Sequence, residues 1–239
     1  INWNETAATG KVTYSPIEGL TLNAIGGMKL FYHFNGSFAT SDFDNTGKNG
    51  MAWRNTSMNL TYNGELYAAY NNRFGKHDIN AVAGYSYYSY NGQSLNTYNY
   101  DFPTDLFEYN NMELGLALKD GTATMSSERT MNKLISFFGR VNYSYDEKYI
   151  AALSIRADGS SKFGPNNRWG AFWSASGAWR ISQEGFMEDV DWLDELKLKF
   201  SYGVTGVEPS SPYLSQMTYN YSNPVSMDGK YIWTISPSA

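Results

Sequence analysis

Apolar and polar residues alternate along much of the chain, most regularly in residues 196–205. There, Leu198 and Phe200 alternate with Lys197 and Lys199. Because successive side chains of a strand point to opposite sides, this pattern predicts a sheet with one apolar and one polar surface. What the protein does depends on whether the apolar surface meets a protein core or lipid.

The same alternation recurs along the chain and predicts eight strands. They fall at about residues 7–15, 20–34, 53–73, 79–97, 132–145, 149–158, 169–182 and 196–205. Short and long connections between them alternate: 16–19, 74–78 and 146–148 are short, whereas 35–52, 98–131 and 159–168 are long. Outer-membrane barrels have this asymmetry, with tight periplasmic turns and longer external loops. The exception is the connection 183–195, which lies on the short-turn side and is expected to hold one turn of helix.

Nine charged residues of the predicted strands fall on the polar side, and no strand centre carries a charge on the apolar side. The nine are Lys11, Lys29, Glu65, Arg140, Arg156, Asp158, Arg180, Lys197 and Lys199. A soluble sheet would also keep charge off its core face, so the aromatic residues discriminate better. Trp169, Trp173 and Trp179 share a face with Ala171 and Ala175, which places bulky rings towards the strand ends. Because Trp and Tyr collect at membrane interfaces, this placement favours lipid contact.

Composition narrows the function classes. The 239 residues include no cysteine, two histidines and 17% aromatic residues, with a net charge of −5. A disulfide framework is therefore excluded, and a nucleic-acid partner is not expected. No stretch approaches the roughly 20 apolar residues of a membrane-spanning helix. His33 and His77 lack a nearby nucleophile motif, so we expect both to be structural or solvated and expect no catalytic centre and no cofactor. No signal peptide opens the chain, which suggests a piece of a longer protein.

Residues 138–206 carry a family resemblance, strongest in the segments 156–163, 167–170, 178–184 and 197–206. These segments resemble the late barrel strands of the SusC/RagA-like TonB-linked outer-membrane transporters of Bacteroidetes. Residues 15–22 and 74–85 are also similar to that family. One departure is Val207, where the family often has Asn after the glycine corresponding to Gly206.

The resemblance implies an all-β fold: an antiparallel transmembrane β-barrel segment contributing about eight strands to a 22-stranded barrel. The plug of that barrel would lie outside this chain. Residues 1–206 would form wall strands with short periplasmic turns and long extracellular loops, and residues 207–239 an extracellular loop and the start of a next strand. The family further implies a bacterial outer-membrane location and import of oligosaccharide or peptide. Its partners would be a SusD-like surface lipoprotein, outer-membrane lipid and TonB, which would be contacted by an N-terminal part outside this chain.

Two loop segments offer candidate binding residues. The segment 98–109 contains five aromatic rings among Asn and Asp residues, and such rings stack on sugar or peptide faces. These rings are Tyr98, Tyr100, Phe102, Phe107 and Tyr109. The alternative is that they pack the loop on itself or on a partner. Asp42 and Asp44 begin a stretch that resembles a calcium loop, but the twelfth position is Trp53 where a bidentate Glu belongs.

Two other functions remain open from the sequence. A soluble β-sandwich could bind carbohydrate through exposed rings, and a passive porin could use the same wall without a plug. A hydrolase would need a nucleophile–base pair, and the sequence offers no motif for one.

Overall fold

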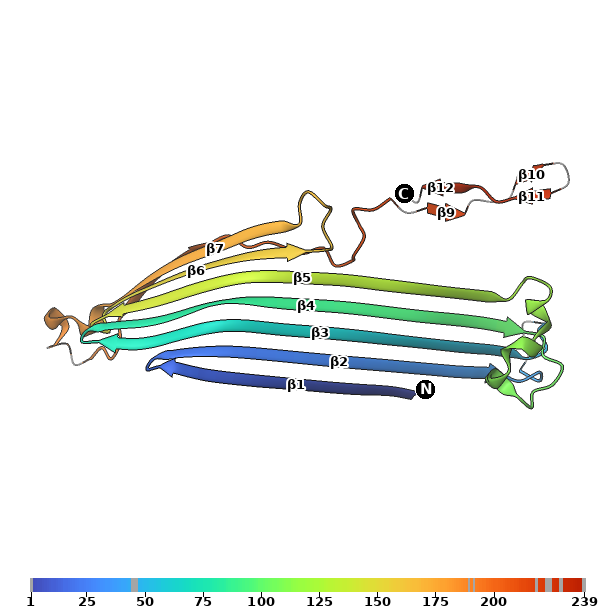
Figure 1. The fold of residues 1–239 in the computed structure, drawn as a ribbon, viewed down its shortest axis with the longest axis horizontal. Helices are drawn as coiled ribbons and strands as arrows, with labels where there is room; N and C mark the ends of the chain where they lie inside the picture. Colours follow the sequence, from blue (N-terminus) through green and yellow to red (C-terminus); the bar gives the residue numbers. More distant parts are fainter. Residues whose placement is uncertain are drawn as a thin grey trace.

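The computed structural model describes residues 2–43, 47–188, 190, 192–217, 219–221, 225–227 and 230–237. Its main feature is one eight-stranded antiparallel sheet in which each strand pairs with the next along the chain (Figure 1). The strands are β1 (Asn2–Ile17), β2 (Leu20–Ala39), β3 (Met51–Phe74), β4 (His77–Tyr100), β5 (Thr124–Tyr145), β6 (Tyr149–Ser160), β7 (Trp169–Arg180) and β8 (Lys197–Gly203). The predicted all-β antiparallel fold and its eight strands are confirmed.

We call the end of the sheet with the short turns the inner end and the opposite end, with the long connections, the outer end. Strands β2 to β5 extend further towards the outer end than the alternation predicts. Both β3 and β4 contain 24 residues, which is about 80 Å at roughly 3.3 Å per residue. The predicted long loop 98–131 is shorter in the structure, because Tyr98 of β4 already pairs with Thr124 of β5. In the extension of β5, the adjacent residues Ser126 and Ser127 put polar side chains on both faces, so the alternation fades while the backbone ladder continues. These strands are longer than the roughly 9–11 residues that a tilted strand needs to cross a bilayer.

The tight turns have backbone angles that suit hairpins. Asp146 and Glu147, between β5 and β6, have φ of 53° and 57°, in the left-handed region that tight hairpin turns favour. Gly19, between β1 and β2, has φ 79°, and a Cβ there would lie 2.5 Å from the carbonyl oxygen of Asn71. Only glycine fits this close approach. Neighbouring turns are tied together by the ion pair between Lys76 and Asp146, 2.7 Å long.

Short helical turns occur only in connections of the described part of the chain. The predicted turn of helix between β7 and β8 is present as η4 (Ile181–Gln183) and η5 (Gly185–Met187). The β4–β5 connection contains η1 (Glu108–Asn110), η2 (Met112–Leu114) and η3 (Leu116–Leu118). Among the described residues, every helix is too short or too polar to cross a membrane. Beyond β8, β9 (Tyr219–Tyr221) pairs with β12 (Ile235–Pro237), and β10 (Val225–Met227) with β11 (Lys230–Ile232).

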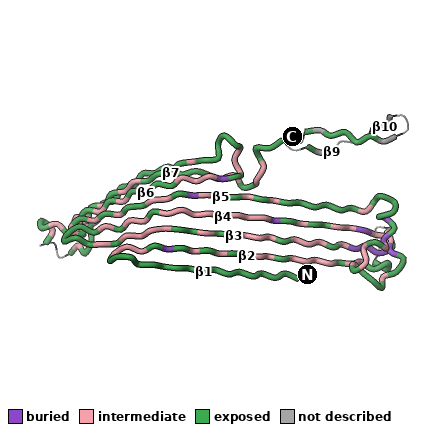
Figure 2. The backbone as a smooth tube through the Cα atoms, viewed as in Figure 1, coloured by how far each residue is buried: buried purple, intermediate pink, exposed green. Residues whose placement is uncertain are grey.

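The sheet is a single layer, and the main apolar core lies at its outer end (Figure 2). The buried apolar residues are Met51, Ala52, Phe102 and Ala117. Leu198, Phe200, Ile155 and Phe137 are 62%, 73%, 60% and 52% exposed. A second layer of polypeptide would cover these four side chains, so the sandwich alternative is wrong for the described residues.

Candidate functional site

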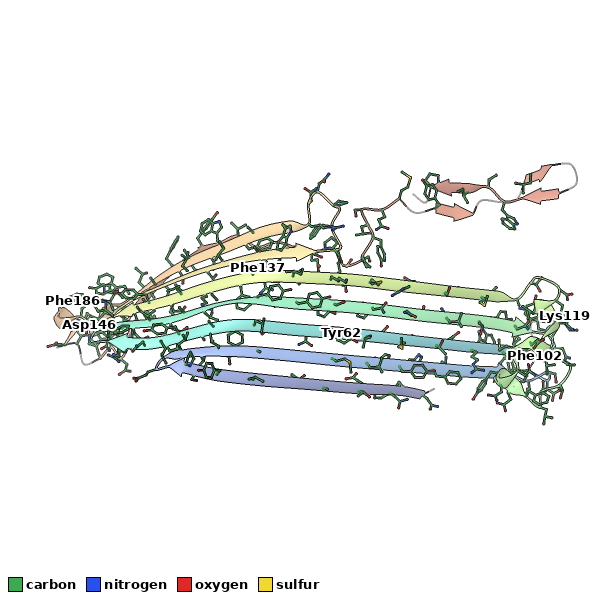
Figure 3. The ribbon with its side chains drawn as sticks, in the orientation of Figure 1. Tyr62, Phe102, Lys119, Phe137, Asp146 and Phe186 are labelled. Atoms are coloured by element: carbon green, nitrogen blue, oxygen red, sulfur yellow. The ribbon has the colours of Figure 1, made fainter. Side chains whose placement is uncertain are left out.

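The register divides the eight strands into two chemically distinct faces. Directly paired residues of neighbouring antiparallel strands share a face, and Leu153 pairs with Val141 on one side and Ala175 on the other. Following such rows across the sheet defines an apolar band on the face that we call the apolar face. One member from each strand is Val12, Leu22, Leu66, Ala83, Phe137, Ile155, Trp173 and Phe200. The band crosses all eight strands, and nothing in the described chain covers it (Figure 3).

The opposite, polar face carries the charged residues that the sequence assigned to it. Lys29 pairs with Glu5 at 2.9 Å. Arg156 donates to Asp158 at 2.7 Å and to the Ser136 hydroxyl at 2.9 Å, and Ser136 is fully buried. Charge is thus partly paired on one face and absent from the apolar band, as predicted.

Aromatic rings border the band at its inner end, next to the short turns. Tyr149 and Trp179 lie directly opposite each other and both donate to the Glu184 carboxylate, at 2.6 and 3.0 Å. Lys148 lies 3.4 Å from the same carboxylate. These hydrogen bonds, with that of Tyr149 the largest cause, hold the pKa of Glu184 below its ordinary value. At the outer end, Trp169 stacks on Phe137 with ring centroids 6.1 Å apart.

Two of the five predicted ring residues lie on the polar face at the outer end of the sheet. Tyr98 stacks on Trp53 with centroids 5.0 Å apart and contacts Tyr100 at 5.6 Å. Lys48 donates to the Tyr98 hydroxyl at 2.8 Å and lies 4.1 Å from the Tyr100 ring centroid. The Tyr98 hydrogen bond is the largest cause that raises the pKa of Lys48 above its ordinary value. We call Trp53, Tyr98, Tyr100 and Lys48 the aromatic row.

Two other predicted rings lie on the opposite side of the same sheet. Phe102 is 2% exposed and meets Phe38 edge-on at 5.6 Å. Tyr109 lies against Gly36, where a Cβ would be 2.5 Å from the ring. Phe38 and Gly36 are on the apolar face of β2, because Phe38 pairs with Ala52 and the alternation continues from Leu22. The β4–β5 connection therefore folds over the apolar face, and its labelled Phe102 lies at the outer end in Figure 3.

Hydrogen bonds fix this connection to the β2–β3 loop. Asp105 accepts from the Ser41 backbone N–H at 3.1 Å and from its hydroxyl at 2.9 Å. Asp101 accepts from the Asn49 backbone N–H at 2.8 Å. Asn99, 3% exposed, donates to the Gly115 carbonyl at 2.9 Å. The fifth predicted ring, Phe107, is 46% exposed.

Sequence reasoning missed Lys48 and Trp53 as members of the aromatic row, and Asp101 and Asp105 as loop anchors. Trp53 and Tyr98 are brought together by strand register, so their pairing is a long-range property. The spacing of Trp53 within its alternating strand was the one available signal, because it places the ring on the polar face.

The remaining predicted residues contribute less to a site. Asp42 is exposed, and Asp44 lies outside the described residues. Within the described ranges, His, Asp and Glu side chains form no group of three that could hold a metal; calcium binding stays a prediction. His33 lies on the polar face, and His77 lies 2.7 Å from the Tyr143 hydroxyl.

Residues 206–213, which we call the strap, fold across the polar face after β8. A Cβ at Gly206 would lie 2.3 Å from the Phe172 ring, and Phe172 is on the polar face opposite Arg156. Glu208 accepts from the Ser160 hydroxyl and lies 3.2 Å from the Lys162 ammonium. Strap and wall enclose a cavity of about 170 Å³ beside Phe172.

Comparisons with known proteins agree with this architecture. No family model matches the chain. It is 36% identical over 169 residues to TonB-dependent receptor P3 of Formosa agariphila. This alignment covers 70% of this chain and 16% of the relative. It is 33% identical over 170 residues to TonB-dependent receptor SusC of Bacteroides thetaiotaomicron, covering 67% of this chain and 15% of the relative.

Solved structures give the same result. The structure of the RagAB peptide transporter matches with a TM-score of 0.84 at 26% identity, over 99% of this chain and 26% of that chain. The RagAB peptide importer in the "open-open" state matches with a TM-score of 0.84 at 27% identity, over 99% of this chain and 25% of that chain. This chain spans less than a fifth of the two curated relatives. It belongs to the family of TonB-dependent receptors, and its sheet is a segment of their β-barrel wall.

Proposed function

We propose that this chain is part of the barrel wall of a TonB-dependent outer-membrane importer of oligosaccharides or peptides. The observation that carries the proposal is the uncovered apolar band on one face of a single-layer sheet, with charge confined to the other face across the band. Lipid is the solvent that such a band fits, since unpaired charge is costly there. The apolar face would then meet lipid, and the polar face would line the lumen.

The remaining family features are proposals for the whole protein. Residues 1–206 form wall strands with short periplasmic turns and long extracellular loops, and residues 207–239 form an extracellular loop leading towards a next strand. A SusD-like surface lipoprotein covers the outer end, and TonB acts through an N-terminal part on a plug within a barrel of about 22 strands. The likeness to the RagAB peptide importer supports this assembly.

The positions of the loop residues support a smaller set of candidates for contact with cargo. The aromatic row is on the lumen-lining face, with three rings and one cation at the outer mouth. Rings of this kind stack on sugar or peptide faces, and a cation bonds polar edges. Phe107 has an exposed ring, whereas Phe102 and Tyr109 lie against the other side of the wall. We therefore assign the first cargo contact to the aromatic row.

Uptake by cells that express the full-length protein tests the proposal. Labelled peptides from a casein digest and labelled maltooligosaccharides, tested separately, report on the two cargo classes. We expect uptake of one class to require both this protein and TonB. Uptake that persists without TonB would instead indicate a passive porin, and uptake of neither class would reject import of these cargoes.

A double substitution in the aromatic row, Trp53→Ala with Tyr98→Ala, tests the cargo contact. Uptake should fall roughly tenfold, because two stacking rings are lost. Tyr32→Ala is the matched control, since Tyr32 lies on the apolar face opposite Met58. Equal uptake by the double variant and the wild type would remove the aromatic row from the cargo path.

A further inference from the structure

We propose that a cationic stripe on the apolar face, formed by Lys133 and Arg129 of β5, binds phosphorylated headgroups of outer-leaflet glycolipid. This inference goes beyond import. It depends on the membrane placement of the sheet but on no transport step, so its failure and the failure of the proposed function are distinguishable.

The charged residues on the apolar face of the eight main strands all have the same sign. Every acidic residue in the eight main strands lies on the polar face: Glu5, Glu65, Asp78, Glu128 and Asp158. The Lys and Arg residues of these strands that lie on the apolar face are Arg54, Arg129 and Lys133. The apolar face of these strands therefore carries Lys and Arg but no Asp or Glu, whereas the polar face carries residues of both charges.

A second observation is where this positive charge begins. Along β5 the apolar face runs outward through Val141, Phe137 and Ile135, and the next residue on that face is Lys133. On neighbouring β4, the residue opposite Lys133 is Ser89. On β5 the first cation of this face thus follows directly after Ile135, and we place the headgroup level of the membrane there.

The surroundings of the stripe suit an anionic polar partner. Lys133 and Arg129 are both exposed, and they lie about 13 Å apart along the strand. Arg129 donates to the Asn91 side-chain oxygen at 3.2 Å, and this hydrogen bond orients its guanidinium. Guanidinium and ammonium groups bind phosphate strongly, and amide and hydroxyl groups bond the adjoining oxygens.

Position selects a lipid over a soluble ligand. The stripe is continuous with the apolar band, so a ligand that reaches Lys133 from the membrane side places its acyl chains against Ile135 and Phe137. A free phosphate would gain the charge contact alone. Cations near an anionic membrane surface each contribute about a factor of five in affinity.

The experiment uses the full-length protein in detergent, titrated with monophosphoryl lipid A and, separately, with its dephosphorylated form. Bound lipid is counted by native mass spectrometry. We expect the wild type to prefer the phosphorylated lipid and the double variant Lys133→Gln with Arg129→Gln to bind it roughly thirtyfold more weakly. Added salt should reduce the preference, because the contact is solvent-accessible.

The matched control is Lys11→Gln with Lys199→Gln, which removes the same charge from exposed positions on the polar face. Its lipid binding should equal that of the wild type, and the gel mobility of the unheated protein verifies that both double variants fold. The proposal is overturned by equal binding of the two lipid forms, by equal loss in both double variants, or by displacement of the lipid with inorganic phosphate alone.

Discussion

The inner and outer halves of the same sheet use apolar side chains in opposite ways. In the inner half, Leu153 and Phe200 are 58% and 73% exposed, on a band that crosses all eight strands. At the outer end, Ala52 is 0% exposed beneath the β4–β5 connection, and Phe102 of that connection is 2% exposed. The outer end behaves like a water-soluble protein, which must bury its apolar surface in itself. The inner half leaves that surface uncovered by the described chain.

This difference agrees with our proposal that a single set of strands meets two solvents, lipid and water. The strands supply a continuous backbone ladder through both regions, so backbone hydrogen bonding does not distinguish them. What changes is the side-chain pattern: apolar and polar residues alternate in the band, whereas Ser126 and Ser127 of β5 put polar side chains on both faces beyond it. The loop connection provides the cover that, on our proposal, lipid provides further in.

The largest expected effect comes from emptying the core of the outer end. Phe102→Ala should destabilise the β4–β5 connection by about 3–5 kcal/mol, because it removes a fully buried ring. Hydrogen exchange of residues 101–123 in the full-length protein measures the loss. Phe107→Ala is the control, since its ring is 46% exposed and its removal should leave the exchange nearly unchanged. Slow exchange in Phe102→Ala would mean that the outer end is not held by this core.

A charge placed in the band tests the lipid side of the comparison. Leu153→Arg should lower the free energy of unfolding in lipid vesicles by about 2–4 kcal/mol. The control Ser154→Arg puts the same residue on the polar face, where Ser154 meets Ser174 at 2.6 Å, and should cost much less. Urea titration of the full-length protein in vesicles compares the two. Equal costs would show that lipid does not cover Leu153.

The smallest effect concerns the aromatic border at the inner end. The folded protein holds the pKa of Glu184 below its ordinary value, so the carboxylate stabilises the fold above the unfolded-state pKa. That contribution is lost as the pH falls through the lowered folded-state pKa.

Glu184→Gln should remove this pH dependence, and the unfolding midpoint measured from neutral to acidic pH checks it. The control Glu195→Gln changes a carboxylate that is 60% exposed and 4.0 Å from Arg180. It should retain the wild-type acid response. A Glu184→Gln variant that is as acid-sensitive as the wild type would show that other carboxylates cause the loss.

The centres of all eight strands were predictable because a half-apolar strand has a period of two that tertiary contacts do not alter. The outer extensions were not, since adjacent residues such as Ser126 and Ser127 of β5 put polar side chains on both faces and leave no alternation to detect. For the same reason the predicted loop 98–131 included Tyr98 and Tyr100, which end a strand. The association of Lys48 with these rings comes from contacts 50 or more residues apart.

The sequence by itself determined that this protein has a sheet with one apolar and one charged face, because side-chain direction follows from local backbone geometry. Only the tertiary structure decided that the ring residues of 98–109 are divided between the two sides of the wall. It also decided that Lys133 is the first charge beyond the apolar band. Both facts depend on strand register and loop packing, which are set by contacts between distant parts of the chain.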